Sequence, residues 1–155
     1  MTDKLKILFL CYGNACRSQM AEGWARQLKG DLIEPSSAGI LASGLSRRAV
    51  RAMAEAGVDI SGQESKTVYD VQDGRFDYLV TLCPAAHELC PPLGCGPRVV
   101  HVPFDDPYTL CAWANDEAEE MNIFRRVRDE IREFVERLPE ALEELNKKSR
   151  PWERL

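Results

Sequence analysis

The sequence contains no apolar run close to the roughly 20 residues that a helix needs to span a bilayer. The apolar stretch near its beginning is also too short for the core of a signal peptide, so we expect a cytoplasmic protein. Basic residues are in the minority, because 20 Lys and Arg stand against 25 Asp and Glu. Nucleic acid and anionic membranes require a basic surface, so neither is expected as a partner. Any anion must therefore bind through local geometry.

Repeats, low-complexity segments and linkers are also missing, and 155 residues predict one domain over residues 1–155. A chain of this length buries a sizeable core without covalent cross-links. Structural disulfides are not expected in a cytosolic protein, so the six cysteines need another explanation. They lie at positions 11, 16, 83, 90, 95 and 111.

Short apolar runs alternate with segments of helical periodicity along the chain. The runs predict strands at 7–10, 32–33, 78–82 and 98–103, of which Pro35 makes the second an edge strand or a short one. Helices are predicted from Ser18, from Ser46 to Gly57 and from Asp116, with a division at Pro139 and a loose tail from Asn146. Strands without polar alternation are buried on both faces, which predicts a three-layer α/β sandwich with a four-stranded parallel sheet.

Such sheets bind ligands beyond the carboxyl ends of their strands. The first strand leads directly into Cys11-Tyr-Gly-Asn-Ala-Cys-Arg17-Ser18, and a helix follows. Five residues between Cys and Arg let the backbone curl into a nest of N–H groups at a helix N-terminus. We predict that Tyr12, Gly13, Asn14, Ala15, Cys16 and Arg17 bind an oxyanion such as phosphate or arsenate. Ser18 is placed to donate its hydroxyl to Cys11, which the positive surroundings favour as thiolate.

Two other interpretations of this segment are possible from the residues alone. A cysteine after a strand is often a small buried apolar residue. The pairs Cys11-x4-Cys16 and Cys90-x4-Cys95 also have the spacing of zinc ligands, although Arg17 is an unfavourable neighbour for a metal ion. The strand, loop and helix context favours the oxyanion loop, and the chain contains no Walker A or GxGxxG pattern.

The motif CYGNACRS resembles the phosphate-binding loop of the low-molecular-weight protein tyrosine phosphatase fold. The continuation Gln19-Met-Ala-Glu-Gly23 is similar to one branch of that fold, the thioredoxin-coupled arsenate reductases. The phosphatase branch has Pro where this chain has Gln19.

An acid is predicted after the fourth strand, in Phe104-Asp105-Asp106-Pro107. A nucleophile that attacks an oxyanion needs an acid to protonate the departing oxygen. An Asp-Pro pair is also a common turn, and spacing alone does not decide between these roles. The resemblance implies that Asp106 is the acid and that Asp105 has a turn or capping role. The segment Asp106-Pro107-Tyr108 is equally similar to the acid loop of tyrosine phosphatases.

Cys83 follows the third strand, and Cys90 lies seven residues further on. Seven residues of helix separate two Cα atoms by about 10.5 Å. A disulfide needs Cα atoms roughly 4.4–6.8 Å apart. Because Pro84, Pro91 and Pro92 disfavour a helix, we expect a mobile loop here, with His87 as a solvated residue. Taken by themselves, these residues favour two buried thiols without a role, and the oxyanion loop at Cys11 reverses that preference.

The resemblance implies a relay in which Cys11 attacks arsenate, Cys83 attacks Cys11, and Cys90 attacks Cys83. Thioredoxin then reduces the Cys83–Cys90 disulfide, so no bound cofactor is needed. Phosphate or sulfate would compete with arsenate, and a monomer is expected. The alternative is a low-molecular-weight tyrosine phosphatase that uses Cys11, Arg17 and Asp106 through a phosphocysteine, with the other two thiols idle.

The remaining cysteines and a possible cation site complete the expectations. Cys16 is expected to pack beneath the loop, Cys95 is a possible second resolving thiol, and Cys111 is expected to be incidental. Some relatives in the reductase branch hold an alkali cation near positions that match Asn14, Glu22 and Ser37. A further acid of that site aligns with Lys66 here, so we expect a lysine ammonium in place of the cation and no metal ion.

Overall fold

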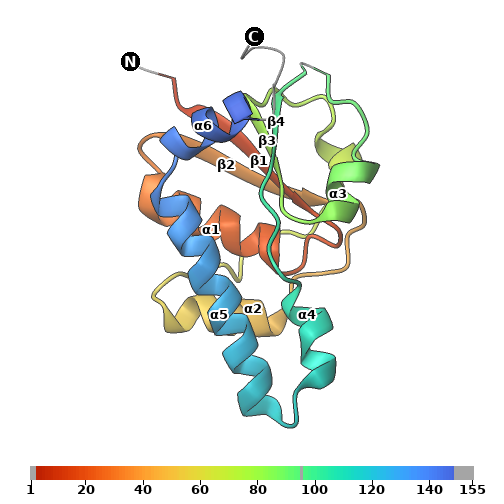
Figure 1. The fold of residues 1–155 in the computed structure, drawn as a ribbon, viewed down its shortest axis with the longest axis vertical. Coiled ribbons are helices and arrows are strands. Elements are labelled where there is room, and N and C mark those ends of the chain that lie inside the picture. The colour runs from red at the N-terminus through yellow and green to blue at the C-terminus, as the bar shows by residue number, and fades with distance from the viewer. Residues whose placement is uncertain (1–2, 95, 149–155) are drawn as a thin grey trace.

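The computed structural model describes residues 3–94 and 96–148, and these form a four-stranded sheet with helices around it (Figure 1). The strands are β1 (Leu5–Cys11), β2 (Ile33–Gly39), β3 (Tyr78–Thr81) and β4 (Arg98–His101). The α-helices are α1 (Arg17–Lys29), α2 (Arg47–Glu55), α3 (Pro84–Leu89), α4 (Pro107–Leu110), α5 (Glu117–Glu136) and α6 (Glu140–Lys148). Two 3-10 helices, η1 (Val68–Val71) and η2 (Cys111–Trp113), complete the elements.

The sheet is parallel throughout, with the strand order β2-β1-β3-β4, as the apolar runs predicted. Strand β2 is an edge strand, which explains how it accommodates Pro35 opposite Ile7. Residues 7–10 of the central strand β1 have no exposed surface. This arrangement brings the carboxyl ends of β1, β3 and β4 to one edge of the sheet.

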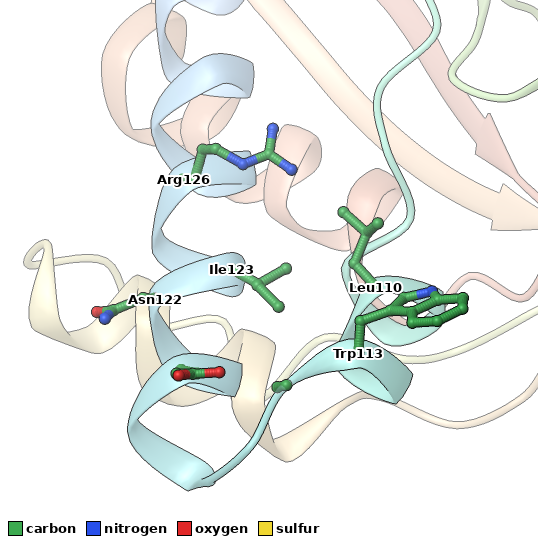
Figure 2. Close-up of a pocket in the computed structure, with 7 residues that line it drawn as sticks. Leu110, Trp113, Asn122, Ile123 and Arg126 are labelled. Atoms are coloured by element: carbon green, nitrogen blue, oxygen red, sulfur yellow. The ribbon is translucent and has the colours of Figure 1, made fainter.

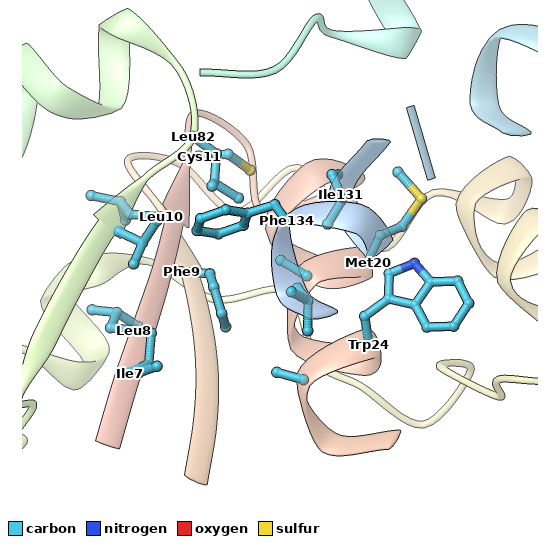
Figure 3. Close-up of a cluster of buried hydrophobic side chains, with 14 of the residues drawn as sticks. Ile7, Leu8, Phe9, Leu10, Cys11, Met20, Trp24, Leu82, Ile131 and Phe134 are labelled. Carbon is cyan, nitrogen blue, oxygen red and sulfur yellow. The ribbon is translucent and has the colours of Figure 1, made fainter. Parts of the chain in front are cut away.

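Helices cover both faces of the sheet (Figure 1). Helices α1 and α5 pack against each other on one face, while α3 lies against β1 and β3 on the other. The core between α1, α5 and the sheet contains Phe9, Met20, Trp24, Ile131 and Phe134, with Cys11 at its upper end (Figure 3). The end of β1 and the start of α1 are therefore fixed in position by the core packed around them.

The helix ends follow the capping residues in the sequence. Ser46 accepts a hydrogen bond from the Ala49 N–H at the start of α2, and Asp116 accepts one from the Glu119 N–H at the start of α5. Pro139 lies between α5 and α6, so the predicted division is confirmed.

Two local expectations were wrong. Residues 84–89 form the helix α3, because Pro84 occupies its first position, where no backbone N–H donor is needed. The expected tail from Asn146 is still helical up to Lys148, because α6 carries Lys147 and Lys148 in its last turn, where positive charge is favourable. Residues 149–155 and Cys95 lie outside the described residues. No helix in the described part of the chain is long and apolar enough to cross a membrane.

Candidate active site

The loop between β1 and α1 turns its carbonyl groups outward. Residues 40–46 donate backbone hydrogen bonds of 2.8–3.2 Å to the carbonyl oxygens of Cys11, Tyr12, Gly13 and Ala15. Within the described residues, the N–H groups from Tyr12 to Cys16 make no hydrogen bond to any protein atom. The first turn of α1 carries no acidic residue. The loop is therefore a cradle of free donors at a positive helix end, as the spacing predicted.

The loop is held in this shape by unusual backbone angles and a close approach. Asn14 has φ of 49°, in the left-handed region that asparagine tolerates better than most residues. A Cβ atom on Gly39 would lie 2.6 Å from the Asn14 nitrogen, so only glycine fits at the end of β2 beside the loop.

A chain of buried hydrogen bonds ends at the Cys11 sulfur. The Ser37 hydroxyl lies 2.7 Å from Glu22 Oε1, and Asn14 Nδ2 lies 3.1 Å from Ser37 Oγ and 2.8 Å from Ser18 Oγ. Ser18 Oγ lies 2.8 Å from Cys11 Sγ. The carboxylate of Glu22 takes the single proton of Ser37, so Asn14 donates to both serines. Ser18 is left with its own proton for Cys11, and this donor stabilises a thiolate.

The orientation of the Asn14 amide is itself fixed. Its Oδ1 accepts hydrogen bonds from the Lys66 backbone N–H at 2.9 Å and from Gln19 Nε2 at 3.1 Å. Gln19 Nε2 also donates to the Glu64 carbonyl at 2.9 Å. These donors keep the NH₂ group of Asn14 turned toward the two serines.

We expect the Ser18→Ala variant to react about tenfold more slowly with iodoacetamide at Cys11 at neutral pH, because a hydrogen bond to a charged group is worth about 1.5–3 kcal/mol. The measurement is the alkylation rate of Cys11, followed by mass spectrometry. The Ser18→Thr variant, which keeps the hydroxyl, is the matched control. Equal rates for the alanine variant and the wild type would contradict the direction assigned to the Ser18 proton.

Arg17 and Asp106 lie together over the loop. Arg17 Nη1 donates to the Phe104 carbonyl at 3.2 Å, and its Nη2 lies 3.7 Å from Asp106 Oδ2. Asp106 is the N-cap of α4, and its side chain accepts hydrogen bonds from the Tyr108 N–H and the Thr109 hydroxyl, at 3.0 and 2.8 Å. These bonds fix the carboxyl group, whose side chain is about one third exposed.

One cleft joins these groups. Its volume is about 560 Å³, and Cys11, Arg17 and Asp106 line it together with the other loop residues except the fully buried Asn14, segment 43–46, Arg48 and Tyr108. Asp105 points elsewhere and pairs with Arg126 of α5 at 3.2 Å. The structure thus brings together the predicted loop residues and Asp106. Tyr108 belongs to the segment that resembles the phosphatase acid loop, whereas Arg48 was not predicted as a lining residue, because only the fold brings α2 to this cleft.

The other thiol of the loop has a different environment. The pKa of Cys16 is raised to about 12, mainly by burial and less by Asp106 and Cys11, against the lowering effects of the Ser46 hydrogen bond and Arg17. Cys16 is therefore held as a neutral thiol beneath the loop, as expected.

Cys83 and Cys90 lie at the two ends of α3. The Leu82 N–H donates to the Leu10 carbonyl, so the ladder between β1 and β3 places Leu82 beside Cys11 and Cys83 one residue beyond it. The side chains face opposite ways, because the Cys11 sulfur contacts Ser18 of α1 and the Cys83 sulfur accepts from the Ala86 N–H of α3.

Cys90 is half-buried at the C-terminal end of α3, and all five cysteines in the described residues are free. Its thiol donates to the Pro91 carbonyl at 3.3 Å, and burial raises its pKa. The helix keeps Cys83 and Cys90 too far apart for a disulfide, so that bond requires α3 to unwind. Cys111 lies outside the cleft, with its pKa raised by burial and by Glu120.

The positive charge beside Glu22 comes from Arg26, and the expectation that the Lys66 ammonium would take the place of a cation there was wrong. Arg26 Nη2 lies 2.6 Å from Glu22 Oε2, and Arg26 Nη1 donates to Gln63 Oε1 at 3.0 Å. Lys66 uses its backbone N–H here, and its ammonium makes no ion pair with any described residue. The sequence signal for Arg26 was its position four residues after Glu22 on one helix. Since Glu22 and Ser37 already have partners, these residues do not fit a bound cation.

A second hollow of about 460 Å³ lies between α4, η2 and α5, and Leu110, Trp113 and Ile123 are among the residues that line it (Figure 2). Its charged residues already have partners, since Arg126 pairs with Asp105 and Glu130, and Glu119 accepts the Asn115 N–H. It contains no nucleophile.

The fold and the cleft define a class of protein: an α/β domain with a cysteine at the start of a loop whose backbone N–H groups are free at a helix N-terminus. The chain belongs to the low molecular weight phosphotyrosine protein phosphatase family, whose model matches residues 6–150. An arsenate reductase of Halalkalibacterium halodurans is 46% identical over 139 residues, which are 90% of this chain and 98% of that protein. An arsenate reductase of Bacillus subtilis is also 46% identical, over 88% of this chain and 98% of that protein.

A solved structure titled as an arsenate reductase in the reduced state is similar, with a TM-score of 0.71 and 32% identity. The match covers 89% of this chain and 98% of that chain. The fold expected from the motifs is therefore confirmed.

Proposed function

We propose that this chain reduces arsenate to arsenite through a relay of Cys11, Cys83 and Cys90, and that thioredoxin restores the reduced state. The observation that carries the proposal is the position of the three thiols. Cys83 follows β3 one residue beyond the point beside Cys11, and α3 joins Cys83 to Cys90. A phosphatase needs only the cleft, whereas a relay needs three thiols that a movement of α3 can bring together, since the folded helix holds Cys83 and Cys90 apart. The names of the similar proteins support the same reaction.

The first step uses the cleft. The N–H groups from Tyr12 to Cys16 and the guanidinium of Arg17 bind the arsenate oxygens, and Ser18 stabilises the Cys11 thiolate. The thiolate attacks arsenic, an S–As bond forms and an As–O bond breaks. Asp106, fixed 3.7 Å from Arg17, supplies a proton to the departing oxygen, which leaves as water.

The next two steps are thiol exchange reactions. Cys83 attacks the Cys11 sulfur, and the electron pair of the S–As bond moves to arsenic, which leaves as arsenite. Two electrons have passed from the two thiols, which now form a disulfide. Cys90 then attacks Cys83, releases Cys11 as thiolate and leaves a Cys83–Cys90 disulfide.

An external dithiol, thioredoxin, supplies the two electrons that reduce the Cys83–Cys90 disulfide and close the cycle. No bound cofactor is required. Phosphate and sulfate are expected to compete with arsenate for the same donors. We further propose that the chain works as a single-domain monomer in the cytoplasm, without nucleic acid or membrane partners.

The alternative function is that of a tyrosine phosphatase. Tyr12 and Tyr108 stand at the cleft with 43% and 75% of their surfaces exposed, where they could flank a phenyl ring. In that reaction Cys11, Arg17 and Asp106 keep their roles on a phosphate ester, and α3 stays folded.

Thiol mapping by mass spectrometry tests the proposal. Fully reduced protein is given arsenate without oxygen, beside a phosphate control. The expected result is a Cys83–Cys90 disulfide and released arsenite with arsenate alone. If all thiols stay free while p-nitrophenyl phosphate is hydrolysed, the reductase is rejected in favour of the phosphatase.

A further inference from the structure

The face of α3 that meets the sheet carries four residues at helical spacing: Cys83, Ala86, His87 and Cys90. Ala86 is fully buried, and His87 Nδ1 lies 2.9 Å from the hydroxyl of Thr81, the last residue of β3. Throughout residues 3–94 and 96–148, this is the one side-chain hydrogen bond that ties α3 to the sheet. The two thiols of the relay therefore flank a helix with a single polar tether.

The tether has a third member. His101, the last residue of β4, places its Nδ1 2.8 Å from the same Thr81 hydroxyl, and the two imidazole rings lie 4.5 Å apart. Thr81 has no exposed surface and a single hydroxyl proton. It donates to one ring and accepts from the N–H of the other when both rings are neutral.

We propose that His87 and His101, joined through the Thr81 hydroxyl, form a latch that keeps α3 on the sheet and opens when both rings carry a proton. The inference rests on the proposed relay and adds the control of its last step. Opening frees α3 to unwind, and only then does Cys90 come within reach of Cys83. Thr81 and the two histidines act here as positioning residues.

Two protonated rings with centroids 4.5 Å apart repel each other, although His87 is exposed to solvent and His101 is partly buried. Burial lowers the pKa of His101 first, and the charge of His87 lowers it further, while Thr81 raises it. From α3 the ionisable neighbours are the thiols of Cys83 and Cys90, and from β3 the side chain that bonds both rings is Thr81, while the Tyr78 hydroxyl bonds Arg98. Glu88 is exposed, and no carboxylate of the described residues pairs with either ring.

The direction of the pH effect follows from this lowered pKa. Because the pKa of His101 is lowered in the closed latch, the closed state binds fewer protons than the open state. The closed state is therefore fully stable above the ordinary pKa of histidine, near 6.5, and loses stability as the pH falls below that value. Opening also removes Cys90 from the burial that raises its pKa, so the same movement makes its thiol more reactive.

Hydrogen exchange of residues 84–90 in the reduced protein tests the latch without arsenate. After correction for intrinsic exchange, their protection is expected to fall by at least about fivefold between pH 8 and pH 5, the factor that one hydrogen bond supplies. Residues 7–10 of β1 serve as the internal control and keep their protection. The His101→Asn variant keeps a polar group at the δ position and is expected to lose the pH dependence.

The Thr81→Val variant is expected to show the low protection at pH 8 as well, and Thr81→Ser is expected to restore wild-type behaviour. In a single turnover with arsenate at pH 8, Thr81→Val should form the Cys83–Cys90 disulfide faster by a similar factor. Protection of residues 84–90 that is independent of pH in the wild type, or unchanged in Thr81→Val, overturns the latch. If arsenate yields no disulfide in any variant, the relay fails and the exchange data alone decide on the latch.

Discussion

The Cys11→Ser variant is expected to lose at least about 10³-fold in kcat/KM, for arsenate reduction and for hydrolysis of p-nitrophenyl phosphate alike, as is usual when a nucleophile is removed. In the proposed mechanism both reactions begin with attack by the Cys11 sulfur, which lies 2.8 Å from Ser18 Oγ in the cleft. A serine hydroxyl has no base here to activate it, because Ser18 donates its proton toward this position and Asp106 acts as an acid.

Cys16 does not rescue the variant, although it lies in the same loop. Its thiol stays protonated at neutral pH, because burial raises its pKa to about 12. The control is Cys111→Ser, which changes a half-buried thiol outside the cleft and is expected to keep wild-type rates. Both activities are measured on both variants, with folding checked by circular dichroism. Activity of Cys11→Ser within tenfold of the wild type would remove Cys11 from the mechanism.

The loop could be predicted from the sequence because its signals are local. The apolar run before Cys11, the five-residue interval to Arg17 and the helical spacing after Ser18 lie within a short stretch of chain. The choice of Asp106 over Asp105 was implied by the resemblance alone. The structure adds that Asp105 turns to Arg126, whereas Asp106 lines the cleft.

What could not be predicted depends on contacts between distant segments. The segment 40–46 that turns the loop carbonyls outward carries no pattern that reveals this role. The shared hydroxyl of Thr81 depends on the register that sets Thr81 opposite His101. Helix α3 is a different case, because Pro84 disfavours a helix interior and suits a first position, and the sequence alone did not locate the helix start.

Substituting Cys83 and Cys90 in separate variants is expected to stop the relay at two different steps. In Cys83→Ser, arsenate turnover is expected to fall by at least about 10³-fold, because no thiol is left beside Cys11 to displace arsenite. Hydrolysis of p-nitrophenyl phosphate is expected to stay within about threefold of wild type, since Cys83 does not line the cleft. This split between two activities of one cleft distinguishes a relay thiol from a residue that merely supports the fold.

Cys90→Ser is expected to stop one step later. Arsenate should release about one arsenite per chain and leave a Cys11–Cys83 disulfide, a burst that marks a blocked second step. Arsenite release and thiol mapping are measured together, with thioredoxin and its reductase present and with Cys111→Ser as the control. Steady turnover by Cys90→Ser at the wild-type rate would show that another thiol resolves the Cys11–Cys83 disulfide. Cys90 reaches Cys83 only when α3 unwinds, and the arsenite burst of Cys90→Ser precedes that step. Adding Thr81→Val to Cys90→Ser should therefore leave the size and rate of the burst unchanged.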